Sequence, residues 1–142
     1  MSEAINFRFL IDGDDFTSAG NASVQVKKML RQLNFDAETI RRVSVAMYEG
    51  EINMVIHANG GSAEVNVWND RIEVVLADSG PGIPDIELAM QEGYSTAKDN
   101  IRSLGFGAGM GLPNMKRYSD DMKITTEIGR GTTVTMSFFV NG

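Results

Sequence analysis

The sequence contains no cysteine, which excludes disulfide bonds, thiolate metal sites and cysteine nucleophiles. Acidic residues outnumber basic ones by 19 to 13, and the resulting net charge of −6 argues against a nucleic-acid partner, since phosphate binding normally requires a basic face. No apolar run is long enough to cross a bilayer, and the N-terminus lacks the basic and apolar regions of a signal peptide. We therefore expect a cytoplasmic protein that has no membrane partner.

Two widespread nucleotide-binding motifs are also missing. No G-x-x-x-x-G-K-[ST] pattern occurs, so the chain is not a P-loop protein. A Rossmann G-x-G-x-x-G pattern that starts at Gly105 requires glycine at position 110, where the chain has Met110. The Rossmann motif must follow a strand, whereas this glycine cluster follows an aperiodic segment.

The remaining composition is that of one ordinary globular domain, residues 1–142, with 42% apolar and 23% charged residues. Alternating apolar residues predict a strand at 5–11, a hairpin at 63–76 with its turn at Asn69-Asp70, and a second hairpin at 122–140. The second strand of the first hairpin has additional apolar residues, which predicts a central position in the sheet.

Helical periodicity predicts two longer helices. The first lies at about 18–33, and its apolar stripe is Val26, Met29, Leu30 and Leu33. The second begins after the N-cap Asp36 and ends near Ala58, and its apolar stripe is Ile40, Val43, Met47 and Tyr48. Shorter helices are predicted at 84–92 and 112–118, with a mobile loop at 94–105. The element order predicts an α+β, two-layer sandwich with helices on one face of a mixed, mostly antiparallel sheet.

Glu49 and Asn53 are the first candidate site residues. They are four positions apart and therefore share one face of the second helix. A carboxylate there is suited to deprotonating a hydroxyl, and an amide oxygen beside it is a reasonable ligand for Mg²⁺. Taken alone, such a pair is far more often part of an ordinary exposed helix surface.

Asp78 is the second candidate, because it shares the parity of the apolar residues in the strand before it and so lies on the buried face. A buried carboxylate requires a partner, and the exocyclic amine of adenine is a suitable donor. Thr132 has the parity of the inward-facing residues of its own strand and is placed to reach the same base, directly or through water. The alternatives are a turn-starting aspartate and a threonine chosen for β-propensity.

Two glycine clusters complete the pattern. Gly80 and Gly82 remove side chains where the chain turns and a flat base approaches. The cluster from Gly105 to Gly111 leads into a helix start, where backbone N–H groups form an anion site suited to phosphates. A flexible loop is the alternative interpretation.

In this order, the motifs resemble those of the Bergerat-fold ATPases, the superfamily of gyrase, Hsp90, histidine kinases and MutL. Glu49 and Asn53 match the N box, Asp78-x-Gly80-x-Gly82 the first glycine box, and Gly107 to Gly111 the second. Within that superfamily the chain is most similar to the small bacterial anti-sigma-factor serine kinases and switch kinases, since Asn53 to His57 follows their N-x-h-I-H pattern.

The resemblance implies phosphoryl transfer from Mg-ATP to a serine or threonine of an anti-anti-sigma-like, STAS-type partner, with a sigma factor or downstream regulator as a further partner and a homodimer as a further possibility. It implies Glu49 as the catalytic base and Asn53 as the metal ligand. The residues implied in ATP binding are Asn53, Asp78, Gly80, Gly82, Ile83, Thr96, Lys98, Gly105, Gly107, Ala108, Gly109, Met110, Gly111, Leu112 and Thr132.

Some features depart from the pattern of these relatives. The segment that resembles the ATP lid is lengthened by residues 99–104 and places Lys98 two positions after Thr96. Gly50 lies inside the N-box helix, where glycine costs about 1 kcal/mol against alanine, and indicates close approach of another backbone or a ligand. Ile56 stands where histidine kinases have lysine, and His57 is interpreted as structural or site-supporting. Two alternatives to the kinase remain: an ATP-gated binding switch without transfer, and a detached histidine-kinase catalytic domain.

Overall fold

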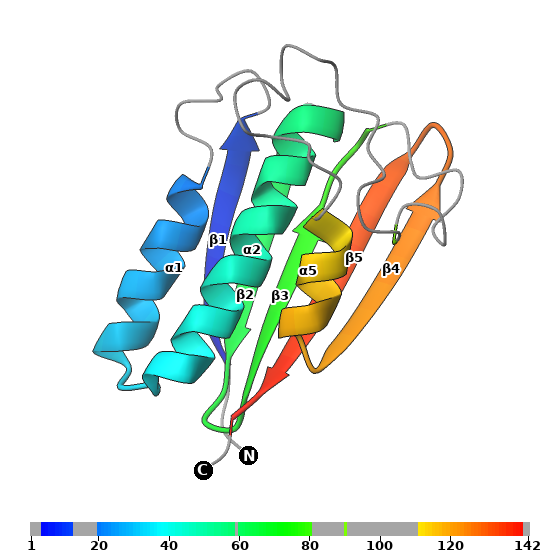
Figure 1. The fold of residues 1–142 in the computed structure, drawn as a ribbon. Helices are drawn as coiled ribbons and strands as arrows, with labels where there is room; N and C mark the ends of the chain where they lie inside the picture. Colours follow the sequence, from blue (N-terminus) through cyan, green and yellow to red (C-terminus); the bar gives the residue numbers. More distant parts are fainter. Residues whose placement is uncertain (1–3, 13–19, 59, 81–89, 91–110, 141–142) are drawn as a thin grey trace, which may run out of the picture.

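The computed structural model describes residues 4–12, 20–58, 60–80, 90 and 111–140, which form a five-stranded sheet and three helices (Figure 1). The elements are β1 Ile5–Asp12, α1 Asn21–Gln32, α2 Ala37–Ala58, β2 Gly60–Val67, β3 Arg71–Ala77, α5 Gly111–Tyr118, β4 Asp121–Glu127 and β5 Gly131–Phe139. The strand order is β1-β2-β3-β5-β4, and every pair among these strands is antiparallel. The α+β fold, the helix layer on one face and the central position of β3 are confirmed.

Three apolar rows cross the sheet on the side that the helices cover. They follow from the strand register, which aligns inward-facing residues of successive strands. From edge to edge the rows are Phe9, Ala63, Leu76, Val134 and Ile124; Phe7, Val65, Val74, Met136 and Met122; and Ile5, Val67, Ile72 and Phe138. The members on β2, β3 and β5 are buried, so the core lies between the middle of the sheet and the helices.

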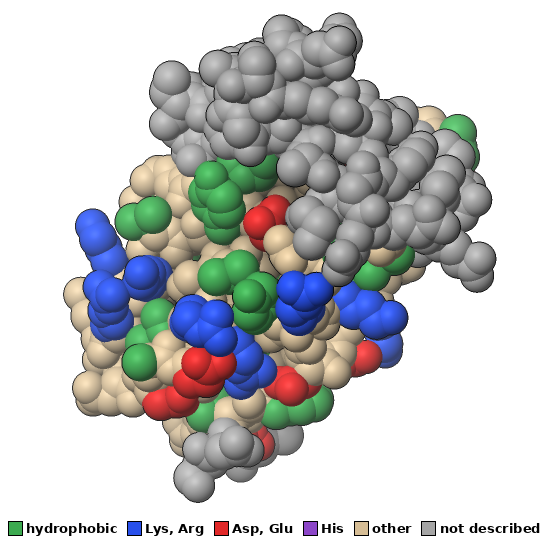
Figure 2. Space-filling view, viewed as in Figure 1, with side chains coloured by type: hydrophobic (Ala, Val, Ile, Leu, Met, Phe, Trp, Pro, Cys, Tyr) green, Lys and Arg blue, Asp and Glu red, His purple; other side chains and the backbone are tan. Residues whose placement is uncertain are grey.

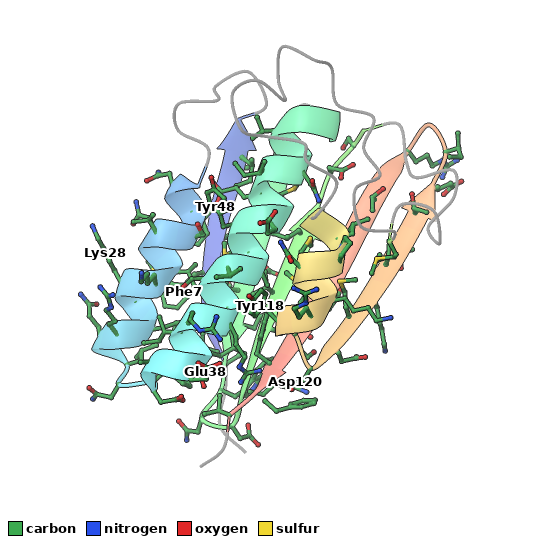
Figure 3. All side chains as sticks on the ribbon, viewed as in Figure 1. Phe7, Lys28, Glu38, Tyr48, Tyr118 and Asp120 are labelled. Carbon is green, nitrogen blue, oxygen red and sulfur yellow. The ribbon has the colours of Figure 1, made fainter. Side chains whose placement is uncertain are left out.

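The helices cover these rows with the stripes that the periodicity predicts, apart from the last residue of each. Val26 and Leu30 of α1 and Val43 and Met47 of α2 are fully buried. Leu33 is 38% exposed because α1 has already ended there. Tyr48 is 41% exposed, because its ring lies over the start of α1 and not in the core (Figure 3).

The predicted N-cap of α2 is confirmed. The carboxylate of Asp36 accepts hydrogen bonds from the backbone N–H and the hydroxyl of Thr39. These bonds, the side-chain one first, hold the pKa of Asp36 below its ordinary value, because they favour the charged form. Asn34, in the connection between the helices, has a φ of 65°, which fits the predicted helix break.

The predicted turn at 12–14, the helix at 84–92 and the loop at 94–105 lie outside the described residues, apart from Asp12 and Met90. Among the described residues, no helix has the length and apolar character needed to span a membrane.

Candidate functional site

A fourth row of inward-facing residues lies at one end of the sheet; its β1 member, Ile11, is buried and apolar, but the row is polar at the ends of β3, β5 and β4, where the other three rows are apolar. Thr126 of β4 pairs with Thr132 of β5, Thr132 is bonded to Asp78 just after β3, and Gly61 of β2 lies beside Asp78. The sequence therefore changes from core to polar residues at the same level of neighbouring strands. This change gives the end of the sheet a hydrogen-bonding edge directly beside the core.

Asp78 is the centre of this polar row. Its backbone N–H donates to the carbonyl oxygen of Thr132 at 2.9 Å, and its Oδ1 accepts from the backbone N–H of Thr132 at 3.1 Å and of Gly80 at 2.9 Å. The bond to Gly80 makes Asp78 a turn-starting aspartate, so this alternative interpretation is correct as far as Oδ1 is concerned. Among the described residues, none donates a hydrogen bond to Oδ2, and the half-buried carboxylate thus retains an acceptor.

Thr132 is buried, at 8% exposed, and its hydroxyl lies 2.9 Å from that of Thr126. The Thr126 hydroxyl also donates to the carbonyl oxygen of Gly131 at 3.3 Å. Thr126 was absent from the predicted site residues, although its place opposite Thr132 follows from the hairpin register. The two threonines form one hydroxyl pair beside Asp78.

The backbone of Asp78 passes between two glycines on neighbouring strands. A Cβ atom at Gly131 would lie 2.1 Å from the carbonyl oxygen of Asp78, and one at Gly61 would lie 2.3 Å from that of Ala77. Gly131 also has a φ of +127°, which other residues rarely adopt. The missing side chains of Gly61 and Gly131 therefore let the neighbouring strands approach the Asp78 backbone closely, and neither glycine is among the predicted site residues.

Glu49 and Asn53 share one face of α2, as their spacing predicts, and that face meets α5. Both are half-buried. Nδ2 of Asn114 lies 3.4 Å from Oε1 of Glu49, and Nδ2 of Asn53 lies 4.0 Å from the sulfur of Met115. The donor end of the Asn53 amide therefore faces α5, which leaves its oxygen turned away from the sulfur and suited to a ligand role.

The groups that approach α2 closely at Gly50 are side chains. The sequence predicted another backbone or a ligand at this position. A Cβ at this position would lie 2.1 Å from Cδ1 of Leu76 and 3.0 Å from Cε of Met115. Both side chains belong to the core. The missing side chain thus lets α2 pack closely on β3 and α5 at the level of Glu49.

Glu51 is a second carboxylate two residues from Glu49, but it has a structural role. It is 2% exposed, and its oxygens accept hydrogen bonds from the backbone N–H groups of Gly20, Ala22 and Ser23 at 2.9, 3.2 and 3.1 Å. These groups belong to the N-terminus of α1, which has no side-chain cap of its own because its N-cap residue is Gly20. A carboxylate of α2 therefore caps α1, and no local signal in the sequence reveals it.

The rest of the predicted site lies outside the described residues: Gly82, Ile83, Thr96, Lys98, Gly105, Gly107, Ala108, Gly109 and Met110. Gly111 begins α5, and Leu112 packs against the core. His57 lies within α2, and its side chain is outside the described part. The described residues contain no cluster of three His, Cys, Asp or Glu side chains that would hold a metal ion. A metal at Asn53 would therefore depend on oxygen atoms from a phosphate and water, as Mg²⁺ commonly does.

Comparison with known proteins places this geometry in a family. Residues 15–138 match the model of the histidine kinase-like ATPase domain. The chain belongs to this family. The match spans the polar row of the sheet, α2 and α5, so the residues described above all lie within the matched domain.

Relatives in bacteria are named as a serine/threonine-protein kinase and as anti-sigma F factors. The chain is 30% identical over 112 residues to the serine/threonine-protein kinase RsbT of Bacillus subtilis, covering 76% of this chain and 78% of that protein. It is 33% identical over 120 residues to the anti-sigma F factor of Clostridium acetobutylicum, covering 81% of this chain and 80% of that protein.

Solved structures support the fold. A Mycobacterium tuberculosis structure of RsbU and RsbW domains matches 97% of this chain with a TM-score of 0.66 at 15% identity, and the chain spans 33% of its length. The mycobacterial sensor histidine kinase MprB matches 96% of this chain and 99% of its own, with a TM-score of 0.55 at 16% identity. At these identities the likeness concerns the fold alone.

Proposed function

We propose that this protein is an ATP-dependent serine/threonine protein kinase of the anti-sigma-factor type. Its substrate is a serine or threonine of an anti-anti-sigma-like, STAS-type partner, and a sigma factor or downstream regulator is a further partner. The observation that carries the proposal is Glu49, a half-buried carboxylate on the N-box helix of a histidine kinase-like ATPase domain. A relative named as a serine/threonine kinase at 30% identity supports transfer over the ATP-gated switch. We place the protein in the cytoplasm, where ATP is available.

The polar row at the end of the sheet receives the adenine. Oδ2 of Asp78 accepts from the exocyclic amine, while Oδ1 stays bonded to Gly80 and Thr132 and fixes the carboxylate's orientation. Because the Thr126 hydroxyl donates to Gly131, the hydroxyl of Thr132 donates to Thr126, and the Thr132 oxygen supplies a further acceptor at the same edge, directly or through water. One oxygen of the Asp78 carboxylate therefore stabilises the fold, and the other binds the adenine.

The transfer step uses Glu49 as general base. Its carboxylate takes the proton of the incoming hydroxyl, whose oxygen forms a bond to the γ-phosphorus as the bond from that phosphorus to the bridging oxygen breaks and ADP leaves. Backbone N–H groups of the cluster that ends at Gly111 hold the phosphates at the start of α5. Positioning and electrostatic stabilisation supply most of the catalysis in such a step.

Asn53 is the proposed Mg²⁺ ligand, and the chemistry of the described residues fits this role. The Asn53 amide oxygen is a hard donor turned away from Met115, and the carboxylate of Glu49 lies on the same face of α2. When bound, Mg²⁺ neutralises phosphate charge during transfer.

The test is phosphate transfer from labelled ATP to a purified anti-anti-sigma-type protein, followed by acid treatment. Acid-stable label on a serine or threonine of the partner supports the kinase. Acid-labile label indicates a phosphohistidine and supports the histidine-kinase alternative. Intact ATP binding without label on any partner supports the ATP-gated switch and contradicts the proposed function.

Nucleotide binding is tested separately with Asp78→Asn. The amide retains an oxygen for the bonds to Gly80 and Thr132 but replaces the acceptor that faces adenine with a donor. We expect ATP affinity to fall about ten- to a hundredfold, the effect of losing one hydrogen bond to a charged group, with little change in the unfolding midpoint. Isothermal titration measures the affinity, and Asp70→Asn in the turn between β2 and β3 is the matched control. Equal affinities for both variants would contradict the adenine contact.

A further inference from the structure

Asn114 of α5 has no role in the sequence motifs, yet it contacts the proposed base. Its Nδ2 lies 3.4 Å from Oε1 of Glu49, and the two residues are separated by 65 positions in the chain. Both side chains are half-buried, so this hydrogen bond is less exposed to competing water than a surface contact. Asparagine is a poor helix former, so its presence inside a helix of eight residues is not explained by helix propensity.

The contact belongs to a closely packed seam between α2 and α5. Next to Asn114, the buried side chain of Met115 meets Asn53 through its sulfur and fills the space over Gly50. At the other end of the seam, the guanidinium of Arg41 lies 5.3 Å from the ring centre of Tyr118 (Figure 3). Contacts in the middle and at the C-terminal end of α5 therefore hold this helix against α2, with Asn114 on the side that meets Glu49.

We infer that Asn114 is a positioning residue for Glu49, an inference that rests on the proposed kinase function. By donating to Oε1, Asn114 holds the carboxylate in one orientation and directs Oε2 to the hydroxyl that loses its proton. Asn114 also lies three residues after Gly111, at the helix start proposed to hold phosphate. The residue that orients the base therefore lies in the first turn of the helix that meets the phosphates.

Asn114→Leu is the decisive variant, because leucine has a similar branched shape, forms helices better and lacks the donor. We expect kcat for phosphate transfer to fall about ten- to a hundredfold, the usual cost of losing a group that orients a catalytic one. The Kd for ATP and the unfolding midpoint should stay close to wild type. Lys116→Ala, an exposed position on the same helix, is the control and should keep the wild-type rate.

A double-mutant cycle shows whether Asn114 acts through Glu49. In the Glu49→Gln background, Asn114→Leu should lower kcat much less than it does in the wild type, because the oriented group is already lost. Equal fold-losses in both backgrounds, or an unchanged kcat in Asn114→Leu alone, would overturn the inference.

The same cycle with Glu49→Ala in place of Glu49→Gln, measured by chemical unfolding, separates this inference from the proposed function, because alanine removes the oxygen that accepts from Asn114 and glutamine keeps it. A coupling between Glu49 and Asn114 in unfolding free energy requires no phosphate transfer, so it reports the contact in any case. Coupling without transfer by the wild type would contradict the kinase and leave the contact intact. Transfer by the wild type without coupling in either assay would contradict the role of Asn114 alone.

Discussion

Two glutamates on one turn of α2 have opposite surroundings and therefore opposite uses. Glu51 is buried and fully engaged by the N-terminus of α1, whereas Glu49 is half-buried and meets one amide. Residue type and sequence position alone do not separate them. Their hydrogen-bond partners distinguish the two glutamates. A carboxylate that accepts from three N–H groups is unsuited to proton transfer, whereas a carboxylate with an available oxygen is suited to it.

Removal of the Glu51 carboxylate should destabilise the protein. Glu51→Ala leaves the N–H groups of Gly20, Ala22 and Ser23 without their acceptor, and an unsatisfied buried donor costs about 1–3 kcal/mol. We expect the free energy of unfolding to fall by roughly 2–4 kcal/mol, within the range for a broken buried network. Urea unfolding measures this value, and Glu38→Ala, on the exposed start of the same helix, should have a far smaller effect. Equal losses would contradict the capping role.

At the scale of the elements, Gly50 controls how closely α2 approaches its neighbours. Alanine at this position gains about 1 kcal/mol of helix propensity, but its Cβ overlaps Leu76 and Met115 in a packed core, and overpacking typically costs about 1–3 kcal/mol. We expect Gly50→Ala to lower the free energy of unfolding by about 1 kcal/mol.

A second substitution tests the cause of that loss. Leu76→Val removes the methyl group nearest to the added Cβ and should cost less stability in the Gly50→Ala background than in the wild type. Thermal unfolding of the four proteins in this cycle measures the difference. A Gly50→Ala variant more stable than the wild type would show that close packing does not require glycine here.

The start of α2 should give stability that depends on pH. Because hydrogen bonds from Thr39 lower the pKa of Asp36 in the folded state, its contribution is present above the pKa of an unfolded aspartate and is lost as the pH falls through the folded value. Asp36→Ala should therefore destabilise the protein at neutral pH, with a difference from wild type that shrinks below about pH 4. Urea unfolding from pH 7 to pH 2.5 measures this trend. A constant difference would exclude the charged cap as the cause.

For the whole molecule, the net charge conceals an uneven distribution. Helices α1 and α5 contain Lys27, Lys28, Arg31, Lys116 and Arg117 and no acidic residue, although the chain is acidic overall. Figure 2 shows Lys and Arg side chains gathered over the helix layer. The net charge therefore describes the whole protein but not the face on which the α2–α5 seam lies.

The fold was predictable because local periodicity reports which face of each element is buried, and the register of two hairpins then aligns the apolar rows. Asp36, Asp78 and the common face of Glu49 and Asn53 could be placed in this way. The cap by Glu51 and the contact of Asn114 could not, since they join residues 28 to 65 positions apart through helix packing. Periodicity identifies the buried face but not the partner that meets it.

The rate of phosphate transfer by Glu49→Gln tests the central claim most directly. Glutamine keeps the oxygen that accepts from Asn114 but removes the base, so transfer to the partner's serine or threonine should fall about 10²- to 10⁴-fold. The Kd for ATP should stay unchanged, and Glu38→Gln, three turns earlier on α2, should transfer at the wild-type rate. A Glu49→Gln protein that transfers phosphate as fast as the wild type would contradict the account.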